Sequence, residues 1–143
     1  MDEIVKLLDS NLEYISHEII NNTLYIEVAS IRRTVVCPYC GAETQKVHSH
    51  YKKGFQDLPI QNCKVVITIN NRKMFFNNSN CSKKTFAESF DFLAPNAKKS
   101  ERLDNEILNI SMNVSSLAAE QIIKNRIANV DKSTICNLLK NRK

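Results

Sequence analysis

The chain has 143 residues, 43% of them hydrophobic, which is enough to bury a core in one compact domain or two small ones. This composition excludes an intrinsically disordered protein, and no apolar run reaches the roughly 18 residues that a membrane span needs. The acidic N-terminus MDEIVKLLDS does not resemble a signal peptide. We therefore expect a cytoplasmic protein with no membrane partner.

The net charge of +5 is distributed unevenly along the chain. Residues 1–30 carry a net charge of −5, whereas residues 31–84 carry +8 and residues 98–143 carry +4. Concentrated positive charge is typical of proteins that bind a polyanion such as DNA. Because a run of charges is usually only a solvated face, this signal needs support from motifs.

The N-terminal part is predicted to consist mostly of strands. A short helix over residues 2–9 precedes two strand patterns, LEYISHEII and TLYIEVAS, which meet at Asn21 and Asn22. Asparagine tolerates the positive φ of a tight hairpin turn. KVHSHYKKGF and CKVVITINNRKMFF predict two further strands, with QDLPIQN as the loop between them. Residues 1–93 are therefore predicted to form a β-rich domain.

After Pro95 the apolar residues repeat with helical spacing, which indicates a boundary. SERLDNEILNISMN, SSLAAEQIIKN and VDKSTICNLLKNRK predict three helices in a second domain, residues 98–143. The second helix is expected to use Leu117, Ala118, Ile122 and Ile123 as its apolar positions. The predicted N-caps are Ser100, then Ser115 or Ser116, and finally Asp131.

The last two predicted helices suit a helix-turn-helix, in which the second helix enters the DNA major groove by its N-terminal end. Its first turns carry groups that can bind phosphates and base edges, namely Lys132, Ser133, Thr134 and Asn137. An ordinary helical hairpin with a polar face explains the pattern equally well. The turn NRIAN counts against the motif, because it lacks the usual glycine and is one or two residues longer than the usual turn.

CPYCG places Cys37 and Cys40 at the spacing of a metal-binding knuckle, and Gly41 supplies the backbone freedom that such a turn needs. In a reducing compartment a close pair of cysteines favours a metal over a disulfide. A tetrahedral zinc site needs four ligands, so a second pair is expected around Cys81. His48 and His50 are predicted to share one face of a strand, either as ligands or simply as part of a polar face.

No catalytic set is found in the sequence. Metal-dependent DNA cleavage needs carboxylates that converge on two Mg²⁺ ions. The acidic residues lie mostly in the N-terminal strands and on the predicted helix surfaces, and there is no Ser–His–Asp or phosphate-loop pattern. We expect the chain not to be an enzyme by itself.

Four stretches together resemble the N-terminal part of bacterial insertion-sequence transposases of the ISL-three family: CPYCG, VHSHYKKGFQDLPI, RKMFFNNSNCSKKTFAE and SLAAEQIIKN…VDKSTICNLLK. The resemblance spans roughly residues 35–143. It implies an α+β fold, a zinc-ribbon-like domain followed by a helix-turn-helix, that binds the terminal inverted repeats of the mobile element. In the family a ribonuclease-H-like catalytic domain follows, and this chain stops at Lys143. The resemblance thus implies a truncated DNA-binding part of a transposase without catalysis of its own.

The resemblance also implies where the fourth zinc ligand belongs. The family pattern has a CxxxxC pair, and counting back from Cys81 its first cysteine falls on Phe76. Phenylalanine has no lone pair to donate, so three of the four expected thiolate ligands remain, namely Cys37, Cys40 and Cys81. Three outcomes are open: His48 or His50 substitutes, water takes the fourth position, or the degraded site holds no zinc.

Basic residues flank the second half of this expected zinc site and are predicted to contact phosphates: Arg72, Lys73, Lys83 and Lys84. The expected partners are double-stranded DNA at the transposon ends and, in addition, a second copy or an intact transposase. Two other functions stay open. The chain can be a regulator that represses transposition, or a zinc-ribbon module that binds a protein or RNA.

Overall fold

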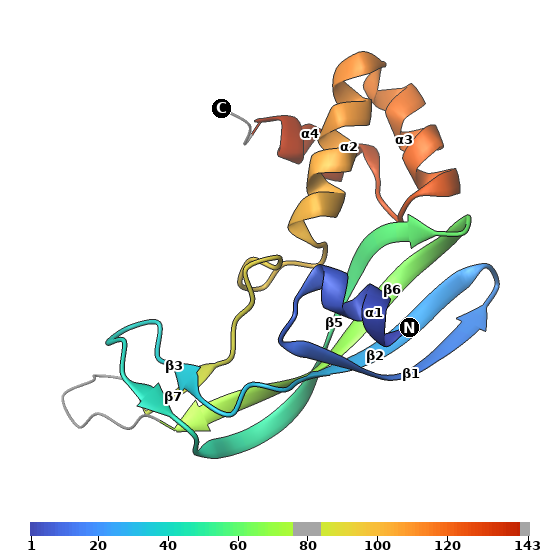
Figure 1. Cartoon of the computed structure of the whole chain (residues 1–143). Helices are drawn as coiled ribbons and strands as arrows, with labels where there is room; N and C mark the ends of the chain where they lie inside the picture. Colours follow the sequence, from blue (N-terminus) through green and yellow to red (C-terminus); the bar gives the residue numbers. More distant parts are fainter. Residues whose placement is uncertain (76–83, 141–143) are drawn as a thin grey trace.

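The computed structural model describes residues 1–75 and 84–140 and has the predicted α+β composition (Figure 1). Among these residues no helix combines the length and the apolar character needed to cross a membrane. The helices are α1 (Asp2–Leu8), α2 (Glu101–Asn113), α3 (Ser116–Arg126) and α4 (Lys132–Lys140). The strands are β1 (Leu12–Ile20), β2 (Thr23–Ser30), β3 (Val35–Val36), β4 (Glu43–Thr44), β5 (Val47–Ile60), β6 (Cys63–Phe75) and β7 (Thr85–Ala87).

The main sheet is built around β6, which pairs along one edge with β5. Its other edge is shared, because β2 pairs in parallel with Lys64–Asn70 and β7 pairs antiparallel with Lys73–Phe75. β1 joins β2 as an antiparallel outer strand. β3 and β4 form a separate small hairpin. β5 therefore lies at the edge of the sheet.

Two-residue turns close both long hairpins. Asn21 and Asn22 have φ of 49° and 61°, which confirms the predicted turn. The predicted QDLPIQN loop is wrong, because β5 continues to Ile60 and only Gln61 and Asn62 turn, with φ of 51° and 64°. Pro59 is compatible with β5 because a strand at the edge of a sheet has backbone N–H groups that need no partner strand.

The main hydrophobic core lies on one face of the sheet, under α1 and the segment that follows β7. Alternate residues of β6 point into it, and the intervening residues are half-buried. Phe90 and Leu93 cover this face from the segment after β7. The buried members are Val5, Leu12, Leu24, Ile26, Val28, Phe55, Val65, Ile67, Ile69, Phe90 and Leu93.

A second core lies among the three C-terminal helices, where Leu103, Ile107 and Ile135 are fully buried. The predicted apolar face of α3 is only partly right. Ile123 is buried, but Leu117 and Ile122 are 60% and 40% exposed, and Ala119 is the second buried residue. Apolar residues occur on more than one side of α3, so their spacing alone does not select the face that packs against α2 and α4.

Side-chain caps start the last three helices as predicted. Ser100 Oγ accepts a hydrogen bond from the Leu103 N–H (3.3 Å), and Ser115 Oγ accepts one from the Ala118 N–H (3.2 Å). Asp131 Oδ1 accepts the Thr134 N–H at 2.7 Å. Each cap satisfies a backbone donor that the first helical turn leaves without a partner.

Asp57 on β5 joins the helices to the sheet. Its side chain is 3% exposed and accepts hydrogen bonds from Ser100 Oγ (2.6 Å) and Arg102 Nε (2.8 Å). A second guanidinium nitrogen of Arg102 bonds the other carboxylate oxygen. Burial alone would raise the pKa of Asp57, but the hydrogen bonds from Arg102 and Ser100 outweigh it and lower this pKa. The first turn of α2 is thus fixed on β5.

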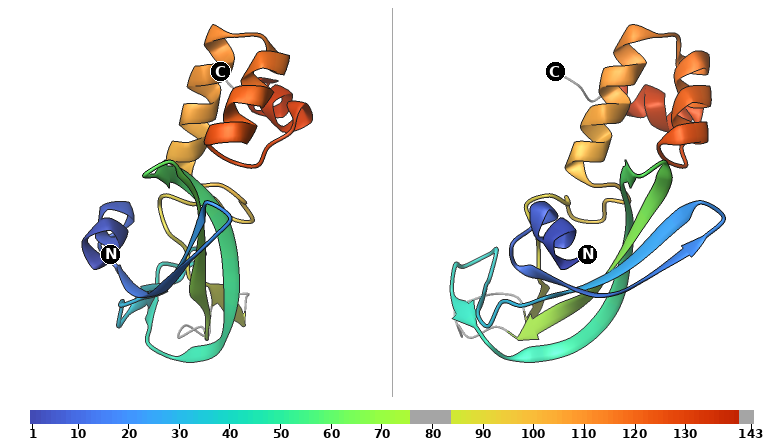
Figure 2. Two further views of the ribbon diagram at one scale, coloured as in Figure 1. Left: turned by 90° about the vertical axis from the view of Figure 1, so that its right-hand side faces the viewer. Right: turned by 45° about the vertical axis from the view of Figure 1, so that its right-hand side comes forward.

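The helical unit and the β3–β4 hairpin lie at opposite ends of the long β5–β6 ribbon (Figures 1 and 2). At the helical end Gln56 and Asn129 exchange two hydrogen bonds, of 2.8 and 3.2 Å, and Leu58 packs against the helical core. Lys64 Nζ also donates to Asn129 Oδ1 at 3.0 Å. The division into domains 1–93 and 98–143 stays a prediction.

Replacing Asp57 with Asn should lower the free energy of unfolding by about 2 kcal/mol at pH 7, because it removes hydrogen bonds to a buried charge. The folded pKa of Asp57 lies below its ordinary value of 3.8, so its stabilising contribution is full above that pH and is lost as pH falls through the folded pKa. Urea unfolding should show the two proteins converging in acid. Asp91→Asn, at an exposed position, is the control, and an equal effect of both changes at pH 7 would contradict the assignment.

Candidate functional site

The CPYCG turn connects β3 to β4 and has the backbone of a metal-binding knuckle. The Gly41 N–H donates to Cys37 O, and the Cys37 N–H donates to Ala42 O, both at 2.9 Å. Gly41 has φ of 75°, a conformation that glycine adopts without strain. The Tyr39 N–H points at Cys37 Sγ, 3.4 Å away. A backbone donor at this position stabilises a thiolate, which is the form of cysteine that binds metals.

The two cysteines of the knuckle have different surroundings. Cys37 is 2% exposed and packs in a small cluster with Val35, Met74 and Phe86, whereas Cys40 lies at the surface. This cluster joins the knuckle to the far end of β6 and to β7. Packing therefore fixes one thiol in place while the other faces outward, as expected for half of a metal site.

The histidines do not complete a metal site within the described residues. His48 falls in a β-bulge between Val47 and Ser49, which interrupts the alternation behind the prediction that both histidines share a face. Its ring packs edge-on against Phe75, with 4.8 Å between centroids, and its Nδ1 lies 2.9 Å from Ser49 Oγ. His50 is exposed.

Of the predicted thiolate ligands, Cys37 and Cys40 are the two that the structure describes. In residues 1–75 and 84–140 no three His, Cys, Asp or Glu side chains are grouped as metal ligands. The predicted third ligand, Cys81, and Phe76, the position at which the resemblance places a further cysteine, lie outside the described residues. The structure thus shows the knuckle backbone around Cys37 and Cys40 and does not group His48 with them.

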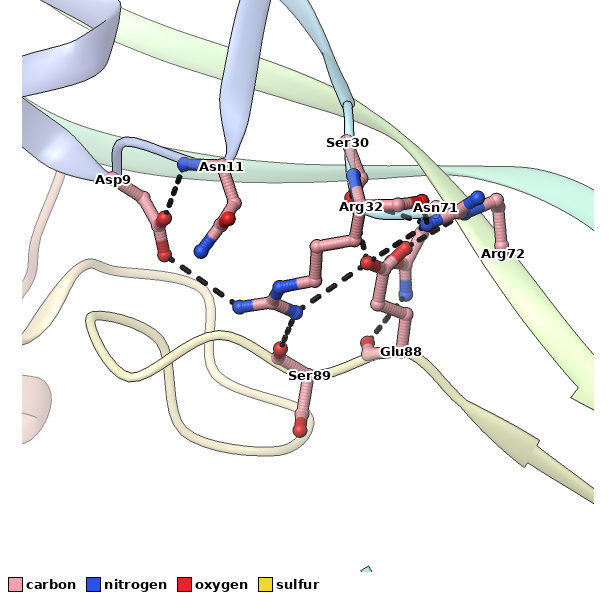
Figure 3. Close-up of polar contacts among 8 residues, drawn as sticks. All are labelled: Asp9, Asn11, Ser30, Arg32, Asn71, Arg72, Glu88 and Ser89. Carbon is pink, nitrogen blue, oxygen red and sulfur yellow. Dashed lines mark hydrogen bonds and ion pairs between the residues drawn. The ribbon is translucent and has the colours of Figure 1, made fainter. Parts of the chain in front are cut away.

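A buried carboxylate, Glu88, organises the segment that follows β2 (Figure 3). The side chain of Glu88 has no exposed surface, and its Oε1 accepts from Arg72 Nε at 2.9 Å. Its Oε2 accepts from Ser30 Oγ (2.6 Å), from a second Arg72 nitrogen (3.1 Å) and from Arg32 (3.4 Å). Arg72 also donates to the backbone oxygen of Arg32 at 2.9 Å. The network fixes the chain where it leaves β2 towards the knuckle.

The place of Arg72 in the Glu88 network does not support its predicted phosphate contact. Its side chain is 14% exposed and its guanidinium already binds Glu88, Ser30 and the backbone of Arg32, so its role here is structural. Sequence reasoning missed Glu88 as the partner. The sequence does contain a signal that Glu88 is paired. Glu88 alternates with Phe86 and Phe90, so it is expected at a core position, and charges at core positions are almost always paired.

The other predicted phosphate contacts lie at the knuckle end of the ribbon. Lys73, on β6, and Lys84, just before β7, are both exposed. Lys83 lies outside the described residues. The buried carboxylate at this end, Glu88, is already paired with Arg32 and Arg72. It therefore does not need the exposed lysines as partners, and these stay available to a phosphate.

The predicted contacts on α4 lie at the opposite end. Ser133 and Asn137 are exposed, whereas Ile135 is buried and Leu138 and Leu139 pack against the helical core, so α4 has one polar and one apolar face. Thr134 is half-buried, and its backbone N–H and its hydroxyl lower the pKa of Asp131 by hydrogen bonding to that carboxylate. The side chain of Lys132 lies outside the described part of the structure.

Residues 33–81 match the family described as the zinc-finger of transposase IS204/IS1001/IS1096/IS1165. This segment contains the whole knuckle and the whole β5–β6 hairpin. The match covers roughly a third of the chain. No curated protein and no solved structure matches the chain.

Proposed function

We propose that this chain is a DNA-binding part of a transposase of the insertion-sequence type and that it recognises the terminal inverted repeats of the element. The observation that carries the proposal is the match of residues 33–81 to the zinc-finger of such transposases. The matched segment coincides with a knuckle whose backbone points an N–H group at Cys37 Sγ. A transposase part with this motif is expected to act on DNA ends.

The arrangement of the C-terminal helices supports the proposal. α4 packs with α2 and α3 around a common core, and its opposite face presents Ser133 and Asn137 to solvent. In a helix-turn-helix the second helix of the motif lies in the major groove in this way, and an asparagine can pair with adenine through two hydrogen bonds. We assign α3 and α4 to this motif, with α4 as the recognition helix.

The knuckle suits a structural zinc ion. Cys37 and Cys40 would supply two thiolates, and we propose Cys81 as a candidate for a third position. Zinc would tie the β3–β4 hairpin to the segment after β6, which adds free energy to folding around the site. The metal in this proposal supports the fold and takes no part in a reaction.

Metal content tests the zinc assignment. Chain purified without added chelator should contain about one zinc per molecule, and the double variant Cys37→Ser, Cys40→Ser should contain essentially none, because it lacks half of a four-ligand site. Elemental analysis by mass spectrometry measures both. Cys136→Ser, which changes a half-buried cysteine of α4, is the matched control and should keep its zinc. Zinc-free wild-type chain, or zinc retained in the double variant, would contradict the assignment.

Gel retardation on duplex DNA tests the recognition helix. The chain should bind a duplex carrying the element's terminal repeat more tightly than a scrambled duplex. Asn137→Ala should reduce this preference about tenfold, since one bidentate base contact contributes about 1–3 kcal/mol of discrimination. Gln121→Ala, at an exposed position on α3, is the control. Equal binding of repeat and scrambled duplexes by the wild-type chain would contradict the proposal and favour a module that binds RNA or protein.

A further inference from the structure

A groove of about 370 Å³ runs along the outer edge of the sheet, between β5 and the segment that leads into α2. Its lining includes Tyr51, Lys52, Lys53 and Lys98. Main-chain hydrogen bonds fix its two walls: the Gln56 N–H donates to Lys98 O, and the Ser100 N–H donates to Gln56 O, both at 2.9 Å. The groove is thus built on paired backbone.

Two lysines face each other across this groove. Burial, together with the positive charge of Lys98, lowers the pKa of Lys53. Among the described residues no carboxylate forms an ion pair with Lys53 or Lys98, whereas the adjacent Lys52 pairs with Glu27 at 3.4 Å. Two like charges held close together without an anion are destabilising, and binding of an anionic group between them would relieve the repulsion.

Tyr51 also lines the groove, and its hydroxyl is held at the buried Asn71. Its hydroxyl oxygen accepts a hydrogen bond from Asn71 Nδ2 at 2.8 Å. The buried Asn71 amide is oriented this way because the same nitrogen also donates to Glu88 O at 3.2 Å, and a carbonyl can only accept. The Tyr51 oxygen is therefore already an acceptor, so its proton points elsewhere, and the residue is 37% exposed.

The groove lies between the two ends that are proposed to contact DNA. Lys53 is four residues from Ser49, which pairs with Lys73 at the knuckle end, and four residues from Asp57, which binds α2. At a strand rise of about 3.3 Å per residue, each of these four-residue separations along β5 is about 13 Å. Lys53 thus lies midway along β5 between the knuckle end and the contact with α2.

We propose that this groove binds a phosphodiester group of the DNA backbone through the ammonium groups of Lys53 and Lys98. The inference rests on the proposed function and adds a contact that is independent of base sequence. Lysines on an edge strand also discourage pairing with other chains. That role does not account for Lys98, which is outside the strand and is fixed opposite Lys53 by the main-chain bonds to Gln56.

Gel retardation over a range of salt concentrations tests the groove in the full chain. The double variant Lys53→Gln, Lys98→Gln should bind every duplex more weakly, and the slope of log affinity against log salt should fall by about 1, as for the loss of one phosphate contact. Its preference for the terminal repeat over a scrambled duplex should not change. Lys6→Gln removes an exposed lysine of α1 that does not line the groove, and it should leave the slope close to that of the wild type.

A double variant with the same affinity and slope as Lys6→Gln overturns the proposal. If the wild-type chain itself binds no duplex, the proposed function fails, and a titration with inorganic phosphate followed by amide NMR shifts decides on the groove separately. The amides of Lys53 and Lys98 should then shift in the wild-type chain and stay unchanged in the double variant. Wild-type amides of Lys53 and Lys98 that do not respond to phosphate overturn the proposal in that case. Amide signals of the double variant that match those of the wild type away from the groove show that the variant is folded.

Discussion

The buried carboxylate of Asp57 is the constraint on which the placement of the C-terminal helices depends. A charge that is 3% exposed must find donors within the fold, and Ser100 and Arg102 provide them from the N-cap and first turn of α2. These contacts fix where α2 begins and which side of it faces β5. Because Leu103 and Ile107 of α2 pack with α3 and α4, the orientation of α4 follows from the same contacts.

Glu88 plays the corresponding part at the other end of the β5–β6 ribbon. Its side chain is fully buried and holds Arg72 of β6 together with Ser30 and Arg32, where the chain leaves β2 for the knuckle. Each end of the ribbon therefore has one buried carboxylate with donors from segments distant in sequence. The two ends that we propose to contact DNA are positioned by these two groups, with the lysine groove between them.

The sequence predicted best what local interactions decide. The Asn21–Asn22 turn and the caps at Ser100, Ser115 and Asp131 depend only on nearby residues, and all are present. The predicted end of β5 was wrong because Pro59 is typical of loops. Proline is compatible with β5 only because β5 lies at the edge of the sheet. The packed face of α3 and the partners of Arg72 depend on segments far away in the sequence. Spacing marks Glu88 as a charge that needs a partner, but it does not identify Arg72 as that partner.

The central claim is that Asp57 and the β5–β6 ribbon hold the knuckle end and the helical unit in one fixed relation. Nitrogen-15 relaxation of the backbone amides in the wild-type chain measures this directly, because it gives a rotational correlation time for each region. Our account predicts one common correlation time for the sheet residues of β2, β5 and β6 and for α2, α3 and α4. A clearly shorter correlation time for the three helices than for the sheet would show that they move independently and would contradict the account.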